Sequence, residues 1–387
     1  KYNLDLDLEN FISSEADIFL EKVSNDTYLK VFEDVVLVNK KFENDLKDKN
    51  NLTSGIKFNL EHENYIFETG FTAYENLQKK TSDRYQYVFP YYRFSNSLFS
   101  DEKGSLNFNS NGRNSLSNTN NLRSNITNNL SYSTSGIYTE NGFVNNFGVY
   151  FQNLNITGKN DTKYKSSLQS ELHNIYEINT SLPLLKADNN FFNYITPKVS
   201  FRFNPSDMKD HSSETRTLTT SNIFEINRLG ISNSYEAGKS LTIGLDYKKE
   251  SKENLDKFLE IKLAGILRDD EENKIPTSSS ANRNTSNLFG SIENSFTEFF
   301  SLNYNFAVDN DFNTIEHNSI ETELSVNNFV TKFNFIEKNG EMGDTNTLAN
   351  TTSYKFNENN ILSFKTRRNR KISLTEYYDL VYEYKND

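Results

Sequence analysis

Hydrophobic residues recur at every second position through most of this chain. In the stretch 222–247, NIFEINRLGISNSYEAGKSLTIGLDY, a polar loop leads into a segment in which Leu241 and Ile243 flank Thr242. A period of two is typical of a β-strand with one apolar and one polar face. The pattern returns in segments of about ten residues, and it predicts about 16–18 strands and no amphipathic helix.

Several segments depart from simple alternation in ways that predict turns and loops. Pro90 interrupts an aromatic strand and removes a ladder hydrogen-bond donor. Residues 100–120 are rich in Ser, Asn and Gly, which predicts a loop around a short strand. Residues 320–336 predict a hairpin that turns at Asn327-Asn328. A long polar loop is expected at 206–237, where the preceding strand stops at a proline.

Composition narrows the class of structure that can carry this pattern. The chain has 387 residues, of which 35% are hydrophobic and 14% aromatic. Low apolar content with a net charge of -11 could indicate disorder, but the 31 Phe and 22 Tyr argue against it. Strands that present every second residue to an apolar medium explain both values. No run of 18 apolar residues exists, which excludes transmembrane helices.

These observations together predict an all-β fold, an antiparallel transmembrane β-barrel that occupies residues 1–387. Short turns alternate with longer polar loops, as in barrels that have tight turns on one rim. A large β-sandwich, a β-propeller and a β-solenoid are the soluble alternatives. A propeller is disfavoured because the chain has no Trp and no repeat of about 40–50 residues.

Candidate chemistry is sparse. The absence of Cys removes disulfides, thiolate metal sites and a Cys nucleophile. Gly238-Lys239-Ser240 lacks the earlier glycine and the following helix of a phosphate-binding loop. Asp309 begins a calcium-like spacing, but Thr314 and Ile320 stand where Gly and Glu are required. We therefore expect no enzyme activity, no cofactor and no metal, and the acidic balance disfavours nucleic acid as a partner.

Basic residues cluster once, near the end of the chain. The cluster comprises Lys365, Arg367, Arg368, Arg370 and Lys371. Arginine forks suit phosphate, so Arg367, Arg368 and Arg370 are candidate contacts for lipid head groups. The alternative is a solvated turn between the last two strands.

The stretch 222–247 resembles the hallmark segment of the LptD family, the lipopolysaccharide-assembly proteins of the outer membrane. The residues that match are Asn227, Arg228, Glu236 and Gly238, while Asn233 stands where the family has Asp. Three further segments resemble barrel strands of this family: ITPKVSFRFNPSD, the terminal LVYEYKND, and SNDTYLKVF near residue 24.

The resemblance implies a C-terminal barrel fragment in the cell outer membrane of a Gram-negative bacterium, without the N-terminal periplasmic domain and the first strands. It implies that the barrel inserts lipopolysaccharide into the outer leaflet through a polar lumen and a lateral seam. The implied partners are lipopolysaccharide, a plug lipoprotein of the LptE type, and periplasmic bridge proteins that bind the missing domain.

Arg228 and Glu236 are the candidates for a structured contact along the substrate path, together with Asn227 and Gly238. An ion pair that only holds the loop is the competing interpretation. Two other functions remain open from the sequence: a general diffusion porin, and a soluble or surface-attached β-rich binding protein.

Overall fold

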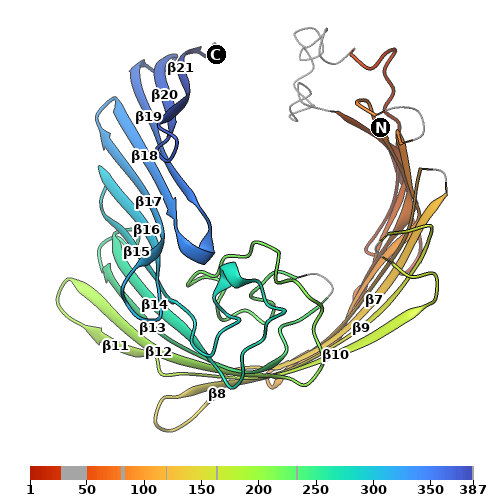
Figure 1. The fold of residues 1–387 in the computed structure, drawn as a ribbon, viewed down its shortest axis with the longest axis horizontal. Coiled ribbons are helices and arrows are strands. Elements are labelled where there is room, and N and C mark those ends of the chain that lie inside the picture. Colours follow the sequence, from red (N-terminus) through yellow and green to blue (C-terminus); the bar gives the residue numbers. More distant parts are fainter. Residues whose placement is uncertain (28–49, 80–82, 119, 163, 232–233, 386–387) are drawn as a thin grey trace. The chain divides into compact units, whose positions relative to one another are not determined.

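The computed structural model describes residues 1–27, 50–79, 83–118, 120–162, 164–231 and 234–385. These residues form 21 strands and two single-turn 3-10 helices, and the strands pair antiparallel with their neighbours (Figure 1). The predicted all-β, antiparallel fold class is confirmed by these strand pairings. No helix in the described ranges is long and apolar enough to span a membrane.

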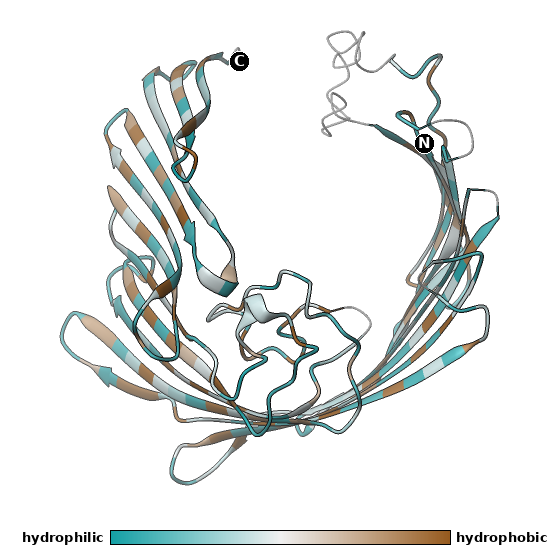
Figure 2. Ribbon diagram, in the orientation of Figure 1, coloured by the Kyte–Doolittle hydropathy of each residue, from teal (hydrophilic) through white to brown (hydrophobic). Residues whose placement is uncertain are grey.

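The strands carry their apolar side chains on an uncovered face. Ile243 is 46% exposed and Leu245 is 42% exposed, whereas Thr242, which precedes Ile243 and points to the opposite face, is only 2% exposed. Figure 2 shows the corresponding alternation of hydrophobic and hydrophilic residues along the strands. This is the reverse of a water-soluble sheet, in which the apolar face is covered, and it suits contact with lipid. An uncovered apolar face of this kind fits the membrane location that the sequence predicts.

The chain divides into two compact units. Unit 1 comprises Lys1–Ser135 and Val149–Asn174, and unit 2 comprises Gly136–Gly148 and Ile175–Asp387. Strands β9 and β10 are divided between the units. The strands assigned wholly or partly to unit 1 are β1 (Tyr2–Asp5), β2 (Ser13–Phe19), β3 (Asn51–Glu61), β4 (Tyr65–Asn76), β5 (Tyr85–Asp101), β6 (Gly104–Ser117), β7 (Asn121–Thr134), β9 (Val144–Lys159) and β10 (Gln169–Ser181).

In unit 1, one prediction from the sequence is wrong and another is confirmed. The loop expected at 100–120 is wrong, because β6 is a complete strand that pairs along its length with β5 and β7. The hydrogen bonds that β6 makes to a strand on each side stabilise it more than the weak strand propensity of its Ser and Asn residues destabilises it. The register between β5 and β6 shifts between Val88 and Tyr91, so Pro90 does interrupt the ladder. The resembling segment near residue 24 lies largely outside the described residues, because 28–49 are not described.

Unit 2 contains the elements that position the candidate site. Its elements are β8 (Ile137–Tyr138), β11 (Leu184–Ala187), β12 (Phe191–Asn204), β13 (Gly238–Ser251), β14 (Phe258–Arg268), η1 (Thr277–Ser279), β15 (Leu288–Thr297), β16 (Phe300–Val308), β17 (Ile315–Val326), β18 (Phe329–Lys338), η2 (Gly340–Met342), β19 (Thr345–Asn357), β20 (Asn360–Asn369) and β21 (Leu374–Tyr384).

The predicted hairpin is confirmed: β17 and β18 pair up to Val326 and Phe329, and Asn327 adopts a φ of 52° that a tight turn requires. The expected count of about 16–18 strands is too low for the described residues. The additional strands are short or polar, and such strands leave little alternation in a sequence.

Two long loops pack on the polar face of unit 2. The predicted loop 206–237 is confirmed between β12 and β13, and a second loop, 269–287, connects β14 to β15 (Figure 1). Their buried residues form one hydrophobic core with the neighbouring strands and η2: Met208, Leu218, Ile223, Leu229, Ile231, Ala237, Ala264, Ile266, Ile275, Ala281, Phe289, Ala307 and Met342. The loops are therefore a packed layer on the sheet, and we call them together the loop layer.

Candidate functional site

Strand register places two arginines on the same side of the sheet. Arg202 on β12 lies opposite Ser240 on β13, and Ser240 lies opposite Arg268 on β14. Directly opposed residues of antiparallel strands point to the same face. This face is covered by the loop layer, and both arginines are buried.

Arg228, in the loop 206–237, contacts the same face of the sheet. It donates hydrogen bonds from Nε to Glu236 Oε2 (2.7 Å), from Nη1 to Thr242 Oγ1 (2.9 Å) and from Nη2 to Ser240 Oγ (3.0 Å). Nη2 also pairs with Glu236 Oε1. The side chains of Arg228 and Glu236 are 1% and 3% exposed. The loop is thus fastened to β13 by charge-assisted hydrogen bonds in the interior.

Glu236 is the carboxylate that all three arginines share. Besides Arg228, it pairs with Arg268, and Arg202 Nη1 lies 3.5 Å from its Oε2. Burial opposes its ionisation, but the surrounding guanidinium charges outweigh burial and hold the pKa of Glu236 at about 2. Glu177 on β10 lies 3.9 Å from Arg202. We call Arg202, Arg228, Arg268, Glu236 and Glu177 the buried charge cluster.

Side chains of the strands also attach the loop by donating hydrogen bonds to its backbone carbonyl oxygens. Arg202 donates to the carbonyl oxygen of Glu225, and Arg268 donates to that of Ala237. Asn204 Nδ2 donates to the carbonyl oxygen of Glu236 at 3.0 Å. The middle and the C-terminal end of the loop are therefore bonded to the strands beneath it.

The other two residues of the predicted motif shape the backbone. Asn227 closes a turn by donating from Nδ2 to the Ile231 carbonyl (2.8 Å) and accepting from the Ile231 amide at Oδ1 (3.1 Å). Gly238 has a φ of +83°, and a Cβ there would lie 3.1 Å from Arg268 Nη2. Glycine thus fits where the loop joins β13. Asn233 lies outside the described residues.

The sequence interpretation missed Arg202, Arg268 and Glu177. A signal does exist: Arg202 and Arg268 occupy polar positions in otherwise alternating strands. Their meeting depends on the register of β12, β13 and β14, which spacing along the chain does not reveal.

The basic run near the end of the chain does not form one patch in a turn. Arg367 and Arg368 lie within β20, where consecutive residues point to opposite faces. Arg367 Nε pairs with Glu376 at 2.9 Å. Arg370 lies in the turn after β20, with its guanidinium carbon 5.6 Å from the centre of the Phe335 ring. Arg367 and Arg370 thus contact different groups, and the lipid-head-group contacts expected of Arg367, Arg368 and Arg370 stay a prediction.

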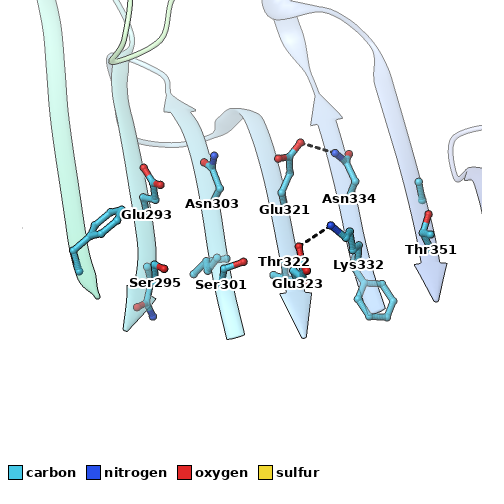
Figure 3. Close-up of a pocket in the computed structure, with 15 residues that line it drawn as sticks. Glu293, Ser295, Ser301, Asn303, Glu321, Thr322, Glu323, Lys332, Asn334 and Thr351 are labelled. Carbon is cyan, nitrogen blue, oxygen red and sulfur yellow. Dashed lines mark hydrogen bonds and ion pairs between the residues drawn. The ribbon is translucent and has the colours of Figure 1, made fainter. Parts of the chain in front are cut away.

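A polar hollow lies on the same face as the loop layer, toward the short turns of β15 to β19. Its volume is about 440 Å³. Figure 3 shows two rows of side chains that cross these strands. The first row contains Glu293, Asn303, Glu321 and Asn334, and the second contains Ser295, Ser301, Glu323, Lys332 and Thr351. The register of the ladders produces both rows.

The hollow offers more acceptor than donor groups. Asn334 Nδ2 donates to Glu321 Oε1 at 2.7 Å, and Lys332 Nζ pairs with Glu323 Oε2 at 2.8 Å (Figure 3). Glu293 is exposed at the edge of the first row. Three carboxylates against one ammonium make this surface complementary to a cationic or donor-rich ligand. Within the described ranges, no group of three or more His, Cys, Asp or Glu could hold a metal ion.

Comparisons with known proteins identify structural neighbours of low sequence identity. No protein-family profile and no curated protein matches the chain. The siderophore receptor PirA of Pseudomonas aeruginosa is 9% identical, with a TM-score of 0.41 over 87% of this chain and 64% of that receptor. A ferric enterobactin receptor variant of the same organism is 10% identical, with a TM-score of 0.40 over 83% and 60%.

A third neighbour is the siderophore receptor PiuA of Acinetobacter baumannii, which is 10% identical, with a TM-score of 0.31 over 86% of this chain and 62% of that receptor. The chain therefore spans less than two thirds of the length of these receptors.

The resemblance to LptD is wrong, and with it the insertion of lipopolysaccharide, the LptE-type plug and the periplasmic bridge partners. The solved structures named above are siderophore receptors, and no family profile matches the chain. The motif has a local physical explanation. Arg228 and Glu236 bind each other in a buried cluster, which any long loop that packs on a polar strand face can use as an anchor.

Proposed function

We propose that this chain takes part in the uptake of a polar ligand across the outer membrane. The ligand moves along the polar face of unit 2 and binds in the hollow formed by β15 to β19. The function is binding and transport, with no chemical step. The observation that carries the proposal is the row of Glu293, Asn303, Glu321 and Asn334, which forms a polar hollow of about 440 Å³ on a sheet whose opposite face is apolar.

The chemistry of the hollow defines the ligand class. Carboxylate and amide oxygens accept hydrogen bonds, and uncompensated carboxylates attract cations. The carboxylates of Glu293, Glu321 and Glu323 outnumber the ammonium of Lys332. A cationic ligand, or a ligand rich in hydrogen-bond donors, therefore fits this surface better than an anion.

The loop layer bounds the path on the same face. Thr220 of the loop 206–237 donates its hydroxyl to Ser291 Oγ on β15 at 2.8 Å. Glu293, the next residue of β15 on that face, lines the hollow, and two residues of a strand span about 7 Å. The loop layer thus ends at the hollow, and the buried charge cluster holds it in position there.

Uptake by the full-length protein in proteoliposomes tests the proposal. We expect uptake of the polycation spermidine to saturate with concentration, and to exceed the uptake of sucrose and succinate. Replacing both Glu293→Gln and Glu321→Gln removes two charges from the first row. The half-saturating concentration should then rise by about tenfold, which corresponds to about 1.4 kcal/mol.

Glu383→Gln is the matched control, because this residue lies on β21 outside the hollow. It should leave the uptake unchanged. Equal and non-saturating passage of all three solutes would identify a diffusion pore and overturn the proposal. Uptake that is unaffected by the double substitution would also overturn it.

A further inference from the structure

A second hollow lies on the apolar face of unit 2, at the strands that carry the loop layer on their other side. It has a volume of about 330 Å³. Its floor is Gly265 on β14, and the side chains around it include Ile243, Leu245, Leu263, Leu267 and Leu288. We call this hollow the apolar groove.

The groove exists because Gly265 has no side chain. A Cβ built at Gly265 would have one heavy atom within 4 Å, the carbonyl oxygen of Asn287 at 3.8 Å. Gly290, on the neighbouring strand β15, contrasts with it, because the Phe306 ring covers the space above that glycine. The space above Gly265 is therefore open, whereas the space above Gly290 is filled.

One end of the groove is polar and aromatic. Thr285 and Asn310, from the connections on either side of β15 and β16, line that end together with Phe312. Phe312 is 69% exposed and has a φ of 60°, a conformation that costs energy for a bulky residue. Aromatic side chains of membrane proteins concentrate at the level of the lipid head groups. The groove therefore runs from that level into the apolar band.

We propose that the apolar groove binds one acyl chain of a membrane lipid, with the lipid head group beside Asn310 and Thr285. The groove is continuous with the exposed apolar face, on which Ile243 is 46%, Leu245 42% and Leu267 43% exposed. In the bilayer, this face contacts hydrocarbon, and a hollow lined by Leu and Ile takes an acyl chain in preference to water. This inference depends on the membrane location and not on the ligand that is transported.

Photo-crosslinking tests the proposal with the full-length protein in bilayers. The probe is a phosphatidylcholine with a diazirine in one acyl chain, and the labelled residues are identified by peptide mass spectrometry. We expect labelling of β14 around Leu263 and Leu267 to exceed that of the apolar face of β19 several-fold. Retention of a lipid by the purified protein in native mass spectrometry is the second measurement.

Gly265→Leu places a side chain in the groove, and its Cβ would have no heavy atom closer than 3.8 Å. This variant should lower labelling of β14 to the level of β19 and abolish lipid retention. The matched control is Leu348→Phe on the apolar face of β19, which should change neither result. Because both variants are expected to fold, the migration of folded and heated samples on a gel checks that they do.

Equal labelling of β14 and β19 in the unmodified protein would show that lipid covers the face without a site, and would overturn the proposal. Strong labelling of β14 that persists in Gly265→Leu would overturn it as well. Recovery of a protein partner crosslinked at β14, in place of lipid, is a third contradictory outcome.

Discussion

At the scale of single residues, Glu236 is the partner on which the buried charge cluster depends. It is the carboxylate shared by Arg202, Arg228 and Arg268, and its side chain is 3% exposed. Three guanidinium groups face two carboxylates, since Glu177 lies beside Arg202. Desolvation makes isolated charges costly in such a place, so the loss of one carboxylate leaves arginines without compensation.

Substituting Glu236→Gln should release the loop 206–237 from the strands. Removing one partner of a buried ion pair typically costs about 3–5 kcal/mol. Tryptic cleavage of the folded protein within this loop measures the release, since the loop contains Arg216 and Lys209. We expect much faster cleavage than in the unmodified protein.

Glu214→Gln is a control in the same loop. The Glu214 side chain is 41% exposed, and it pairs with Arg216 and with His211, each at 2.8 Å. An exposed pair of this kind contributes about 0–1 kcal/mol, so cleavage should change little. Similar cleavage rates for the two variants would contradict the assignment of the buried charge cluster as the anchor.

The anchor should also depend on pH in a defined direction. The pKa of Glu236 is about 2 in the folded protein and about 4.3 in an unfolded chain. A lowered pKa stabilises the folded state in full above the unfolded value, and this stabilisation is lost as the pH falls through the folded value. Cleavage of the loop by pepsin should therefore stay slow at about pH 4 and accelerate toward about pH 2.

The acceleration should be absent in Glu236→Gln, which lacks the titrating carboxylate and should be cleaved rapidly at both values. Release of the loop from the unmodified protein already near pH 5 would show that another group controls it.

At the scale of elements, the loop layer behaves as a small folded body on the sheet. Ile223 is fully buried, and Leu218 is 2% exposed, although both belong to a connection between strands. A connection with its own hydrophobic core keeps one shape, unlike a solvated loop. This explains how it can bound a path on the polar face.

Ile223→Ala tests this description of the loop layer. Truncation of a buried Ile costs about 2–5 kcal/mol, so the loop 206–237 should become sensitive to protease. Leu255→Ala is the control, because Leu255 is 58% exposed in the short turn between β13 and β14 and should be nearly neutral. Protease resistance equal to that of the unmodified protein would show that the loop does not depend on its core.

The elements also show how far the sequence determines the structure. The alternation of Leu241, Ile243 and Leu245 predicts β13, and its bounds leave the predicted loop 206–237 intact. By contrast, β6 carries Ser, Asn and Gly, and its strand conformation is imposed by the ladders of β5 and β7. Pairing partners are non-local information, which local composition does not contain.

The candidate site, too, could be predicted only in part from the sequence. Arg228 and Glu236 stand close together in the sequence, so their pairing could be predicted as one of two interpretations. Arg202 and Arg268 lie 66 positions apart and meet only because each opposes Ser240. The polar hollow likewise arises from register, since Glu293, Asn303 and Glu321 come from three strands.

At the scale of the whole molecule, the chain gives each strand two chemically different faces. The low hydrophobic content of 35% is a consequence, because only alternate residues meet the hydrocarbon. The resemblance to LptD did not predict the function. The short motif that carries it attaches one loop to the sheet, whereas the function depends on what the polar face binds.

The most direct test of ligand uptake along the polar face is the chemical blocking of the hollow. The chain contains no Cys, so Asn303→Cys introduces a single thiol into it, in the first row of the hollow. Leu324→Cys is the matched control, because Leu324 lies on the opposite face of β17 and does not line the hollow. Saturable uptake of spermidine is measured before and after reaction with a bulky, membrane-impermeant maleimide. The proposed function predicts that Asn303→Cys reacts and loses most of its uptake, while Leu324→Cys neither reacts nor changes; full reaction at Asn303→Cys with unchanged uptake would contradict it.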